Sequence, residues 1–339
     1  MVDRIGVVGY GYWGSKHVRV MSSLPGVVVT VIDANPDRLV EARGVHPAVR
    51  IEQSLEAALP ELDAVVIASP PGAHAPLALQ AIEAGKGVLV EKPLATTVED
   101  AELMVERAEA KGVCLMAGHT FEYNAAVWKL KEIVDSGELG RILYVDTARL
   151  DLGKYQSDCN VIWDLAPHDI SIISYLLGEM PARTAVWAQG CVGGRYSDVA
   201  YLQMTFDDSD VHAYTHVSWL DPRKVRRVTV VGERKMAVYN DLSDNERIRV
   251  YDIGVDVLES DDLHAMPVSY RTGDIVSPYV QFSEPLTVQD SHFLECLRTG
   301  RRPDTPGERG LDVVRVLAAT DEAWVDPSVP VRRPMRTAS

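Results

Sequence analysis

A glycine-rich turn near the start of the chain has the composition of a dinucleotide-binding loop. Gly9-Tyr10-Gly11-Tyr12-Trp13-Gly14 has the spacing G-x-G-x-x-G and directly follows the apolar run Ile5-Gly6-Val7-Val8. In such a loop the first glycine permits a tight turn, the second lets the backbone approach a pyrophosphate, and the third lets the helix pack on the strand. N–H groups at the start of that helix attract phosphates. The alternative is a glycine-rich turn that binds nothing.

Asp33 directly follows the next apolar strand, Val27–Ile32, and is placed to select the cofactor. An acidic side chain at this position accepts hydrogen bonds from ribose hydroxyls and repels a 2′-phosphate, so it favours NAD over NADP. Arg38 lies nearby in the sequence and could weaken this preference. Alternatively, Asp33 serves only as a turn residue before Asn35-Pro36.

The tripeptide Glu91-Lys92-Pro93 follows another apolar run, Gly87-Val88-Leu89-Val90. Ligands of open parallel sheets bind beyond the carboxyl ends of the strands, which places Lys92 at the crevice. A lysine there can donate to a substrate hydroxyl and stabilise a developing alkoxide, and we expect Glu91 to pair with it. Without the glycine loop the tripeptide would be interpreted as an exposed turn.

Asp164 and His168 lie four residues apart, so on a helix they face the same side. A histidine beside a carboxylate is a suitable general base near neutral pH. The alternative is the capped start of a helix, with Pro167 in its first turn and His168 partly buried.

Alternating strands and helices in the first part of the chain must position these groups. Continuous apolar runs, typical of strands covered on both faces, occur at 5–9, 27–32, 63–68, 87–90 and 113–117. Helical stretches at 73–84 and 97–110 are followed by glycines, and Thr97 is placed to cap the second. This order predicts a doubly wound parallel sheet.

The pattern changes after residue 120. Helices are expected at 124–136, 169–177, 288–298 and 310–325, and strands at 142–150, 185–189, 198–206, 211–219 and 225–231. Short turns between neighbouring strands favour antiparallel pairing. We therefore predict an α/β protein with a dinucleotide-binding domain at 1–120, and an α+β domain with a mostly antiparallel open sheet at 121–339. Helices covering one face of that sheet would leave the other apolar and exposed, so we expect a homodimer or homotetramer.

The composition is that of an ordinary globular chain. In 339 residues, 34 Lys and Arg are opposed by 49 Asp and Glu, which gives a formal net charge of −15. Without a basic stripe, such a chain repels nucleic acid and anionic membrane surfaces. The 4 cysteines match no zinc or redox spacing, so we expect no metal site. The N-terminus lacks a signal-peptide pattern and no apolar run would span a membrane, which predicts a cytoplasmic protein.

The motifs occur in a characteristic order along residues 4–325. They are the glycine loop, Asp33, Ser69-Pro70-Pro71 with His74, Glu91-Lys92-Pro93, Gly118-His119, and Asp164 with His168. This ordered set resembles the glucose–fructose oxidoreductase / inositol dehydrogenase (Gfo/Idh/MocA) family. The resemblance implies a Rossmann domain, a C-terminal domain whose open sheet often forms the subunit interface, and hydride transfer between a nicotinamide cofactor and a sugar, sugar nucleotide or cyclitol. It also implies that Lys92, His168 and Asp164 match the family's lysine, acid/base histidine and nearby aspartate.

One stretch departs from the family pattern. Many members carry a Gly-Gly pair just before the aspartate, whereas residues 158–163 read DCNVIW. The run at 160–171 is similar to a subgroup associated with bacterial surface-glycan and sugar-nucleotide pathways, including enzymes similar to UDP-N-acetylglucosamine 3-dehydrogenases. The departure weakens the inference of inositol specificity.

We therefore expect an NAD(P)-dependent dehydrogenase or ketoreductase acting on a ring hydroxyl of a sugar, with a nucleotide sugar as substrate. His168 takes the proton, Lys92 stabilises the oxyanion, and Asp164 helps to hold the sugar and tune the site. One alternative is a free-sugar or cyclitol dehydrogenase, which a pocket lacking cations would favour. Another is a catalytically inactive cofactor-binding sensor, which the presence of both Lys92 and His168 disfavours.

These interpretations assign specific residues to each ligand. NAD, with NADP possible, is assigned to Gly9, Gly11, Tyr12, Trp13, Gly14, Asp33, Arg38, Ser69, Pro70, His74, Glu91 and Lys92. The substrate is assigned to Lys92, His119, Tyr123, Arg149, Lys154, Asn160, Asp164 and His168. For Arg149, Lys154 and Asn160, an ordinary surface role is an equal alternative.

Overall fold

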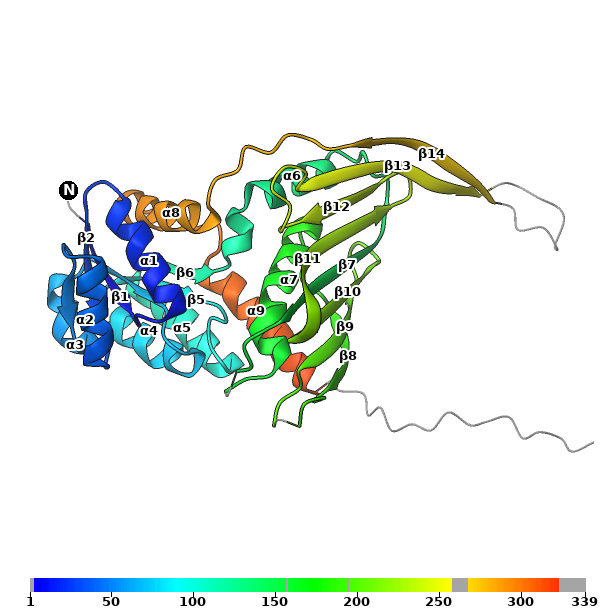
Figure 1. Ribbon diagram of the computed structural model, residues 1–339. Coiled ribbons are helices and arrows are strands. Elements are labelled where there is room, and N and C mark those ends of the chain that lie inside the picture. Colours follow the sequence, from blue (N-terminus) through cyan, green and yellow to red (C-terminus); the bar gives the residue numbers. More distant parts are fainter. Residues whose placement is uncertain (1–2, 157, 194, 258–267, 323–339) are drawn as a thin grey trace, which may run out of the picture.

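Two α/β halves lie side by side in the computed structural model, which describes residues 3–156, 158–193, 195–257 and 268–322 (Figure 1). The first half contains a parallel sheet of 6 strands, and the second contains a sheet of 8 strands. The cleft described below lies where the two halves meet.

The first sheet has the strand order β3-β2-β1-β4-β5-β6, and every neighbouring pair is parallel. Its strands are β1 (Asp3–Val8), β2 (Val27–Ile32), β3 (Arg50–Glu52), β4 (Ala64–Ile67), β5 (Gly87–Glu91) and β6 (Leu115–Gly118). This is the Rossmann order, in which ligands bind beyond the carboxyl ends of the strands where the winding reverses. The predicted parallel sheet is confirmed. The short strand β3 was not predicted, because it contains only one apolar side chain.

Helices on both faces of this sheet carry the chain from strand to strand (Figure 1). They are α1 (Tyr12–Ser23), α2 (Pro36–Val45), α3 (Leu55–Ala58), η1 (Leu59–Glu61), η2 (Pro71–Ala73), α4 (His74–Glu83) and α5 (Val98–Lys111). As predicted, Thr97 caps α5 by accepting a hydrogen bond from the N–H of Asp100, and Gly112 ends the helix with φ 63°. Only glycine adopts that backbone conformation without strain.

The second sheet has the order β14-β13-β12-β11-β7-β10-β9-β8. Its strands are β7 (Ile142–Leu152), β8 (Arg183–Gln189), β9 (Val199–Phe206), β10 (Val211–Ser218), β11 (Leu220–Gly232), β12 (Met236–Asn240), β13 (Ile248–Val257) and β14 (Val268–Val276). Neighbours are antiparallel except β7 and β10, which run parallel in the middle of the sheet. The prediction of a mostly antiparallel sheet is confirmed, although it did not include β12, β13 and β14.

The helix α7 (Val161–Leu177) begins earlier than the sequence predicted. Asn160 caps it, accepting hydrogen bonds from the N–H groups of Ile162 and Trp163. Pro167 therefore lies inside the helix, not in its first turn. The missing N–H of a proline leaves a carbonyl of the preceding turn without its helical partner. Asp164 and His168 consequently lie on a single helix, as their spacing predicted.

The remaining helices are η3 (Thr120–Tyr123), α6 (Ala125–Asp135), α8 (Pro285–Thr299) and α9 (Gly307–Glu322). Two of them, α8 and α9, pack against elements of the first half. Although α8 is close to the end of the chain, it packs on α1 and η3, and its Phe293 and Leu294 belong to the same core as Val7 and Met21. Helix α9 packs against both α5 and α7. The predicted end of that helix, residues 323–325, lies outside the described residues.

One face of the larger sheet is covered by α6, α7 and α9, while Figure 1 shows no described helix over the opposite face. Tyr144, Tyr201 and Tyr214 are exposed on strands β7, β9 and β10. The side chains of Tyr201 and His216 stack, with ring centroids 4.0 Å apart. This open face matches the arrangement predicted from the strand pattern.

Candidate active site

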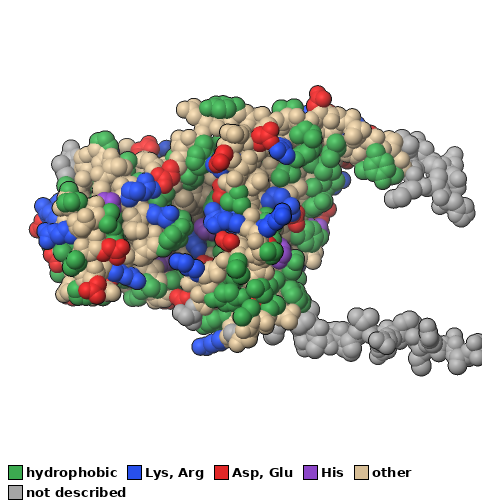
Figure 2. Space-filling model, viewed as in Figure 1, with side chains coloured by type: hydrophobic (Ala, Val, Ile, Leu, Met, Phe, Trp, Pro, Cys, Tyr) green, Lys and Arg blue, Asp and Glu red, His purple; other side chains and the backbone are tan. Residues whose placement is uncertain are grey.

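A cleft of about 1960 Å³ runs from the glycine turn to the larger sheet. This volume exceeds the ~300–1,000 Å³ of a typical ligand pocket. Its walls include these predicted residues: Gly9, Gly11, Tyr12, Trp13, Asp33, Arg38, Ser69, Pro70, His74, Glu91, Lys92, Arg149, Lys154, Asn160, Asp164 and His168. On the face shown in Figure 2, Lys and Arg side chains are interspersed with acidic ones across both halves.

The glycine turn has the backbone geometry that its motif requires. Gly9 has φ 91°, and a Cβ there would lie 2.8 Å from the carbonyl oxygen of Ala68. A Cβ on Gly14 would lie 1.7 Å from the carbonyl oxygen of Gly9, so only glycine lets α1 start this close to the strand. Around Gly11 the space is open, with only Arg38 within 4 Å of such an atom. Helix α1 also starts without a side-chain cap, so its first N–H groups are available to a diphosphate.

Asp33 is buried directly after β2 and has the hydrogen bonds of its alternative role, that of a turn residue. Its carboxylate accepts hydrogen bonds from the N–H groups of Tyr10, at 2.8 Å, and Asn35, at 2.9 Å. It thus holds the turn, while it also lines the cleft. The guanidinium of Arg38 lies 3.6 Å from the carboxylate, and this ion pair reduces the local negative charge.

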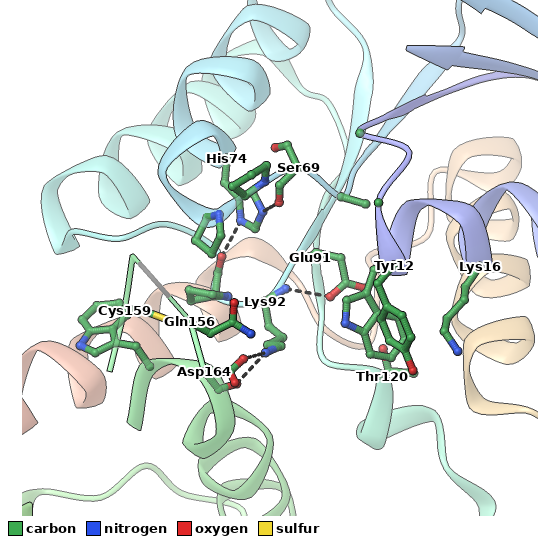
Figure 3. Close-up of a pocket in the computed structure, with 18 of the residues that line it drawn as sticks. Tyr12, Lys16, Ser69, His74, Glu91, Lys92, Thr120, Gln156, Cys159 and Asp164 are labelled. Carbon is green, nitrogen blue, oxygen red and sulfur yellow. Dashed lines mark hydrogen bonds and ion pairs between the residues drawn. The ribbon is translucent and has the colours of Figure 1, made fainter. Parts of the chain in front are cut away.

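The loop after β4 is tied to the loop after β5 by His74. The ring nitrogens of His74 lie 2.8 Å from the carbonyl oxygen of Pro93 and 2.9 Å from that of Ser69. Burial lowers the pKa of His74. Its neutral imidazole donates a hydrogen bond to only one of these carbonyl oxygens. The ring lies between the two loops, and Ser69 and Pro70 line the cleft beside it (Figure 3).

Lys92, from the first half, and Asp164, from the second, are in contact across the cleft (Figure 3). The ammonium group of Lys92 donates to the carbonyl oxygen of Asp164 at 2.6 Å and lies 3.4 Å from its carboxylate. The other carboxylate oxygen of Asp164 accepts a hydrogen bond from the indole of Trp219 at 3.0 Å. The expected pairing of the Lys92 ammonium with Glu91 is not what the structure contains. Glu91 instead accepts from the backbone N–H of Lys92, at 3.2 Å, and from His17.

His168 lines the same cleft one helical turn after Asp164. Its ring packs edge-on against Phe121, with centroids 5.0 Å apart. Burial and the positive charges of Lys92, Arg149 and Arg226 hold the pKa of His168 well below its usual value. The imidazole is therefore neutral at pH 7 and can accept a proton, as a general base must.

The cations of the substrate side are mostly paired with carboxylates. Arg149 donates to Asp169 at 2.8 and 3.1 Å, and its guanidinium lies 4.6 Å from the ring centre of Phe121. Although burial opposes the charged form, Asp169 raises the pKa of Arg149. The prediction that Arg149 contacts substrate therefore needs qualification, because this guanidinium already has a buried partner. Lys154 and Asn160 line the cleft as predicted, and Asn160 also caps α7.

Two predicted substrate residues do not reach the cleft. Tyr123 is buried, and its hydroxyl forms a hydrogen bond of 2.9 Å with Thr305. His119 is also buried, and neither ring nitrogen has a partner among the described residues. Burial and the charge of Arg309 lower the pKa of His119 to about 3. Both side chains are buried and neither belongs to the cleft wall, so the geometry does not support their assignment to substrate.

Sequence reasoning missed the contribution of β11 to the cleft. Lys224 and Arg226 line the wall and pair with Asp151 and Asp241, each at 3.2 Å. These two cations alternate with period two, which puts them on one face of a strand. The spacing of Lys224 and Arg226 was the only sequence signal for this part of the cleft wall, and it belongs to no motif that would link β11 to the cofactor site.

Comparison with known proteins agrees with this geometry. A profile described as "Oxidoreductase family, NAD-binding Rossmann fold" matches residues 4–119, and a profile described as the GFO/IDH/MocA C-terminal domain matches residues 127–238. The chain belongs to the Gfo/Idh/MocA family of NAD-binding oxidoreductases.

Relatives within the Gfo/Idh/MocA family differ in substrate. UDP-N-acetylglucosamine 3-dehydrogenase of Acidithiobacillus ferrooxidans is 28% identical over 74% of this chain and 77% of its own length. Its structure covers 96% of this chain and 98% of its own, with a TM-score of 0.78. Inositol 2-dehydrogenase 2 of Saccharopolyspora erythraea is 34% identical over 53% of this chain and 55% of its own length.

Other matches concern the fold and the cofactor. A solved protein from Magnetospirillum magnetotacticum is 30% identical, covers 94% of this chain and 100% of its own, and has a TM-score of 0.80. A protein of gentamicin A biosynthesis crystallised with NAD has a TM-score of 0.78 at 22% identity, covering 95% of this chain and 94% of its own. The chain spans 60%, 60% and 55% of the first three curated relatives it matches.

Metal ligands and membrane spans are both absent from the described part of the chain. Residues 3–322, without the gaps stated above, contain no group of three or more His, Cys, Asp or Glu side chains arranged to hold a metal ion. Within the same residues, no helix has both the length and the apolar character needed to cross a membrane.

Proposed function

We propose that this oxidoreductase transfers hydride between NAD and a ring hydroxyl of a nucleotide sugar, with carbon 3 as the first position to test. The observation that carries the proposal is the meeting of Lys92, Asp164 and a neutral His168 in one cleft that begins at the glycine turn. The similarity to UDP-N-acetylglucosamine 3-dehydrogenase, at 28% identity over 74% of this chain, supports this substrate class.

The residues of the cleft then have separable tasks. When bound, NAD supplies the hydride acceptor. In the oxidative direction, the neutral imidazole of His168 accepts the hydroxyl proton, while the ammonium of Lys92 donates a hydrogen bond to the oxygen on which negative charge develops. Asp164 holds the Lys92 ammonium and is itself held by Trp219. The diphosphate of the substrate is assigned to Lys154, which has no ion-pair partner among the described residues, and to Lys224.

A second candidate is a free sugar or a cyclitol. Three cations of the substrate wall, Arg149, Lys224 and Arg226, are already paired with carboxylates, so less positive charge is available for a diphosphate. The similarity to inositol 2-dehydrogenases over about half of the chain favours the same alternative.

Formation of reduced nicotinamide, followed by absorbance, tests both candidates. The purified protein is incubated with NAD and either UDP-N-acetylglucosamine, free N-acetylglucosamine or myo-inositol, with His168→Ala as the matched blank. Turnover of the nucleotide sugar alone supports the first proposal. Turnover of only the free sugar or inositol supports the second. Cofactor binding without turnover of any ring hydroxyl would favour the inactive sensor that the sequence left open.

Several broader features are part of the same proposal. We assign cofactor binding to residues 1–120 and substrate binding with oligomerisation to residues 121–339, and we place the protein in the cytoplasm. NAD is preferred over NADP because of Asp33. The open face of the larger sheet, with Tyr144, Tyr201 and Tyr214, joins copies of the chain into a homodimer or homotetramer. Light scattering that gave only a monomer at micromolar concentration would contradict this assembly.

A further inference from the structure

A buried cluster of three ionisable side chains lies directly behind Lys92. The imidazole of His17, on α1, has one ring nitrogen 3.0 Å from a carboxylate oxygen of Glu91, at the end of β5. Its other ring nitrogen lies 3.0 and 3.1 Å from the two oxygens of Asp290, on α8. His17 and Asp290 are completely inaccessible to solvent. None of the steps assigned above uses His17 or Asp290.

The geometry fixes the number of protons in this cluster. A neutral imidazole donates through only one nitrogen, whereas a carboxylate oxygen accepts from each nitrogen of His17. Each contact needs one proton, so with both carboxylates ionised the ring carries two protons and is an imidazolium. Although burial opposes the charge, Asp290 and Glu91 raise the pKa of His17 to about 10. Two carboxylates with one imidazolium leave the cluster with one net negative charge.

That charge faces the part of the cleft that begins at the glycine turn. Of the three residues only Glu91 lines the cleft. Figure 3 shows Glu91 between Lys92 and Tyr12, with Thr120 nearby. The neighbouring Lys92 ammonium is shared with Asp164, so it is not a full counter-ion of the cluster. Because Glu91, His17 and Asp290 are all buried, their charge acts more strongly than a charge on the surface.

We propose that Glu91, held in place by His17 and Asp290, sets the redox-state preference of the cofactor site. The nicotinamide ring is positively charged in NAD⁺ and neutral in NADH, so one fixed negative charge beside the cleft favours the oxidised form. Glu91 is thus a specificity-determining residue, and His17 and Asp290 are positioning residues that act through it. The inference rests on NAD binding alone and not on the identity of the sugar.

The same cluster also connects α1, the end of β5 and α8. A test must therefore distinguish an effect of its charge from an effect of losing these structural contacts. Asp290→Asn removes one carboxylate without altering any residue of the cleft wall, and Glu91→Gln removes one at the wall itself. In each variant the net charge becomes zero as long as His17 keeps its second proton. Asp3→Asn is the matched control. Asp3 is another buried carboxylate in contact with α8, through Arg298 at 2.8 Å, but it does not line the cleft.

The measurement is the dissociation constant of each variant for NAD⁺, NADH and ADP-ribose, obtained by calorimetry without any sugar. ADP-ribose lacks the nicotinamide ring and reports on the glycine turn. We expect the ratio of the dissociation constants, NAD⁺ over NADH, to rise about three- to tenfold in Asp290→Asn and in Glu91→Gln. Binding of ADP-ribose should remain unchanged, and Asp3→Asn should keep the wild-type ratio.

Other results would overturn the inference. If all three ligands weakened equally, the cluster would be structural support only. An unchanged ratio in a folded Glu91→Gln variant would lead to the same conclusion, even if Asp290→Asn failed to fold. Failure of every sugar in the turnover assay, with the shifted ratio still present, would reject the proposed substrate and leave this inference standing.

Discussion

Two histidines near Lys92, His17 and His168, have pKa values shifted in opposite directions. His17, behind the cofactor side, contacts two carboxylates and has a pKa raised to about 10. His168, on the substrate side, is surrounded by Lys92, Arg149 and Arg226, and its pKa lies well below the usual value. Burial lowers the pKa of both side chains, so it does not explain the difference between them. The sign of the neighbouring charges decides which histidine is a fixed cation and which is a base.

The largest expected effect concerns the base. His168→Ala and Lys92→Ala should each lower turnover by about 10²- to 10⁴-fold, because each removes a group that acts on the reacting hydroxyl. Both variants should bind NAD and melt nearly as the wild type does. Lys129→Ala, an exposed lysine on α6 paired with Glu132, is the control and should keep full activity. Near-normal turnover of His168→Ala would move the base to Asp164 or Tyr155.

The second-largest effect is expected for the buried ion pair of Arg149 and Asp169, near His168. Arg149→Met leaves the carboxylate of Asp169 buried without its partner, which typically costs about 3–5 kcal/mol of unfolding free energy. The double variant Arg149→Met/Asp169→Leu should recover much of this loss, because no lone charge remains. Denaturant unfolding measures both, and equal stabilities of the single and double variants would refute the explanation.

A third prediction uses the pH dependence of stability. Below pH 6.5 His17 is protonated in both the folded and unfolded chain, so its contribution is fully present. As the pH rises from 6.5 towards about 10, only the folded state keeps that proton, and the unfolding free energy falls by about 1.4 kcal/mol per pH unit. His17→Gln should lack this alkaline slope. An identical slope in both proteins would show that His17 titrates normally.

His168 should have the opposite dependence, on the acid side. Because its folded pKa is lowered, the unfolded chain takes up a proton first as the pH falls below 6.5, and stability declines. For the same reason, kcat/KM in the oxidative direction should fall at low pH, with its midpoint below 6.5. A midpoint above 6.5 would mean that the surrounding cations do not control this residue.

The smallest expected effect concerns the cofactor side. Asp33→Asn keeps an oxygen that can accept a hydrogen bond from Tyr10 but removes the charge that would repel a 2′-phosphate. The preference for NAD over NADP should narrow by about tenfold in the ratio of dissociation constants. Arg38→Gln should widen it, because Arg38 lies 3.6 Å from this carboxylate. Equal or tighter binding of NADP by the wild type would contradict the proposed preference.

The parts of the site that depend on the backbone were predictable from the sequence. Gly9 and Gly14 are required by close approach and a positive φ, so their spacing, together with the apolar strand before them, identifies the turn. Lys92 and Asp164 were both predicted as site residues, but their contact was not, because it joins elements from different halves. The partner of Glu91 was wrongly expected to be Lys92 for a similar reason. His17 and Asp290 are 273 residues apart, and no local pattern indicates that they meet.

Other predictions failed because local sequence does not show which side chains become buried or where a helix begins. Tyr123 and His119 follow a strand of the parallel sheet, where ligand contacts are common, yet both side chains are buried. The start of α7 was missed because Pro167 suggested a first turn, whereas the cap at Asn160 begins the helix before it. Strands β13 and β14 carry mixed polar and apolar residues, so they lack the continuous apolar runs that identified the parallel sheet. Strand β12 is a short apolar run that was not predicted.

The position of α8 has a consequence for how the chain is made. Phe293 and Leu294 complete the core beneath α1, and Asp290 supplies one of the two carboxylates around His17. During synthesis the first 120 residues leave the ribosome long before these side chains do. Until the last sixth of the chain has been synthesised, the nascent Rossmann half therefore exposes hydrophobic surface, and His17 lacks the carboxylate of Asp290. A chain truncated before α8 would retain every motif that identifies it and still lack a finished cofactor site.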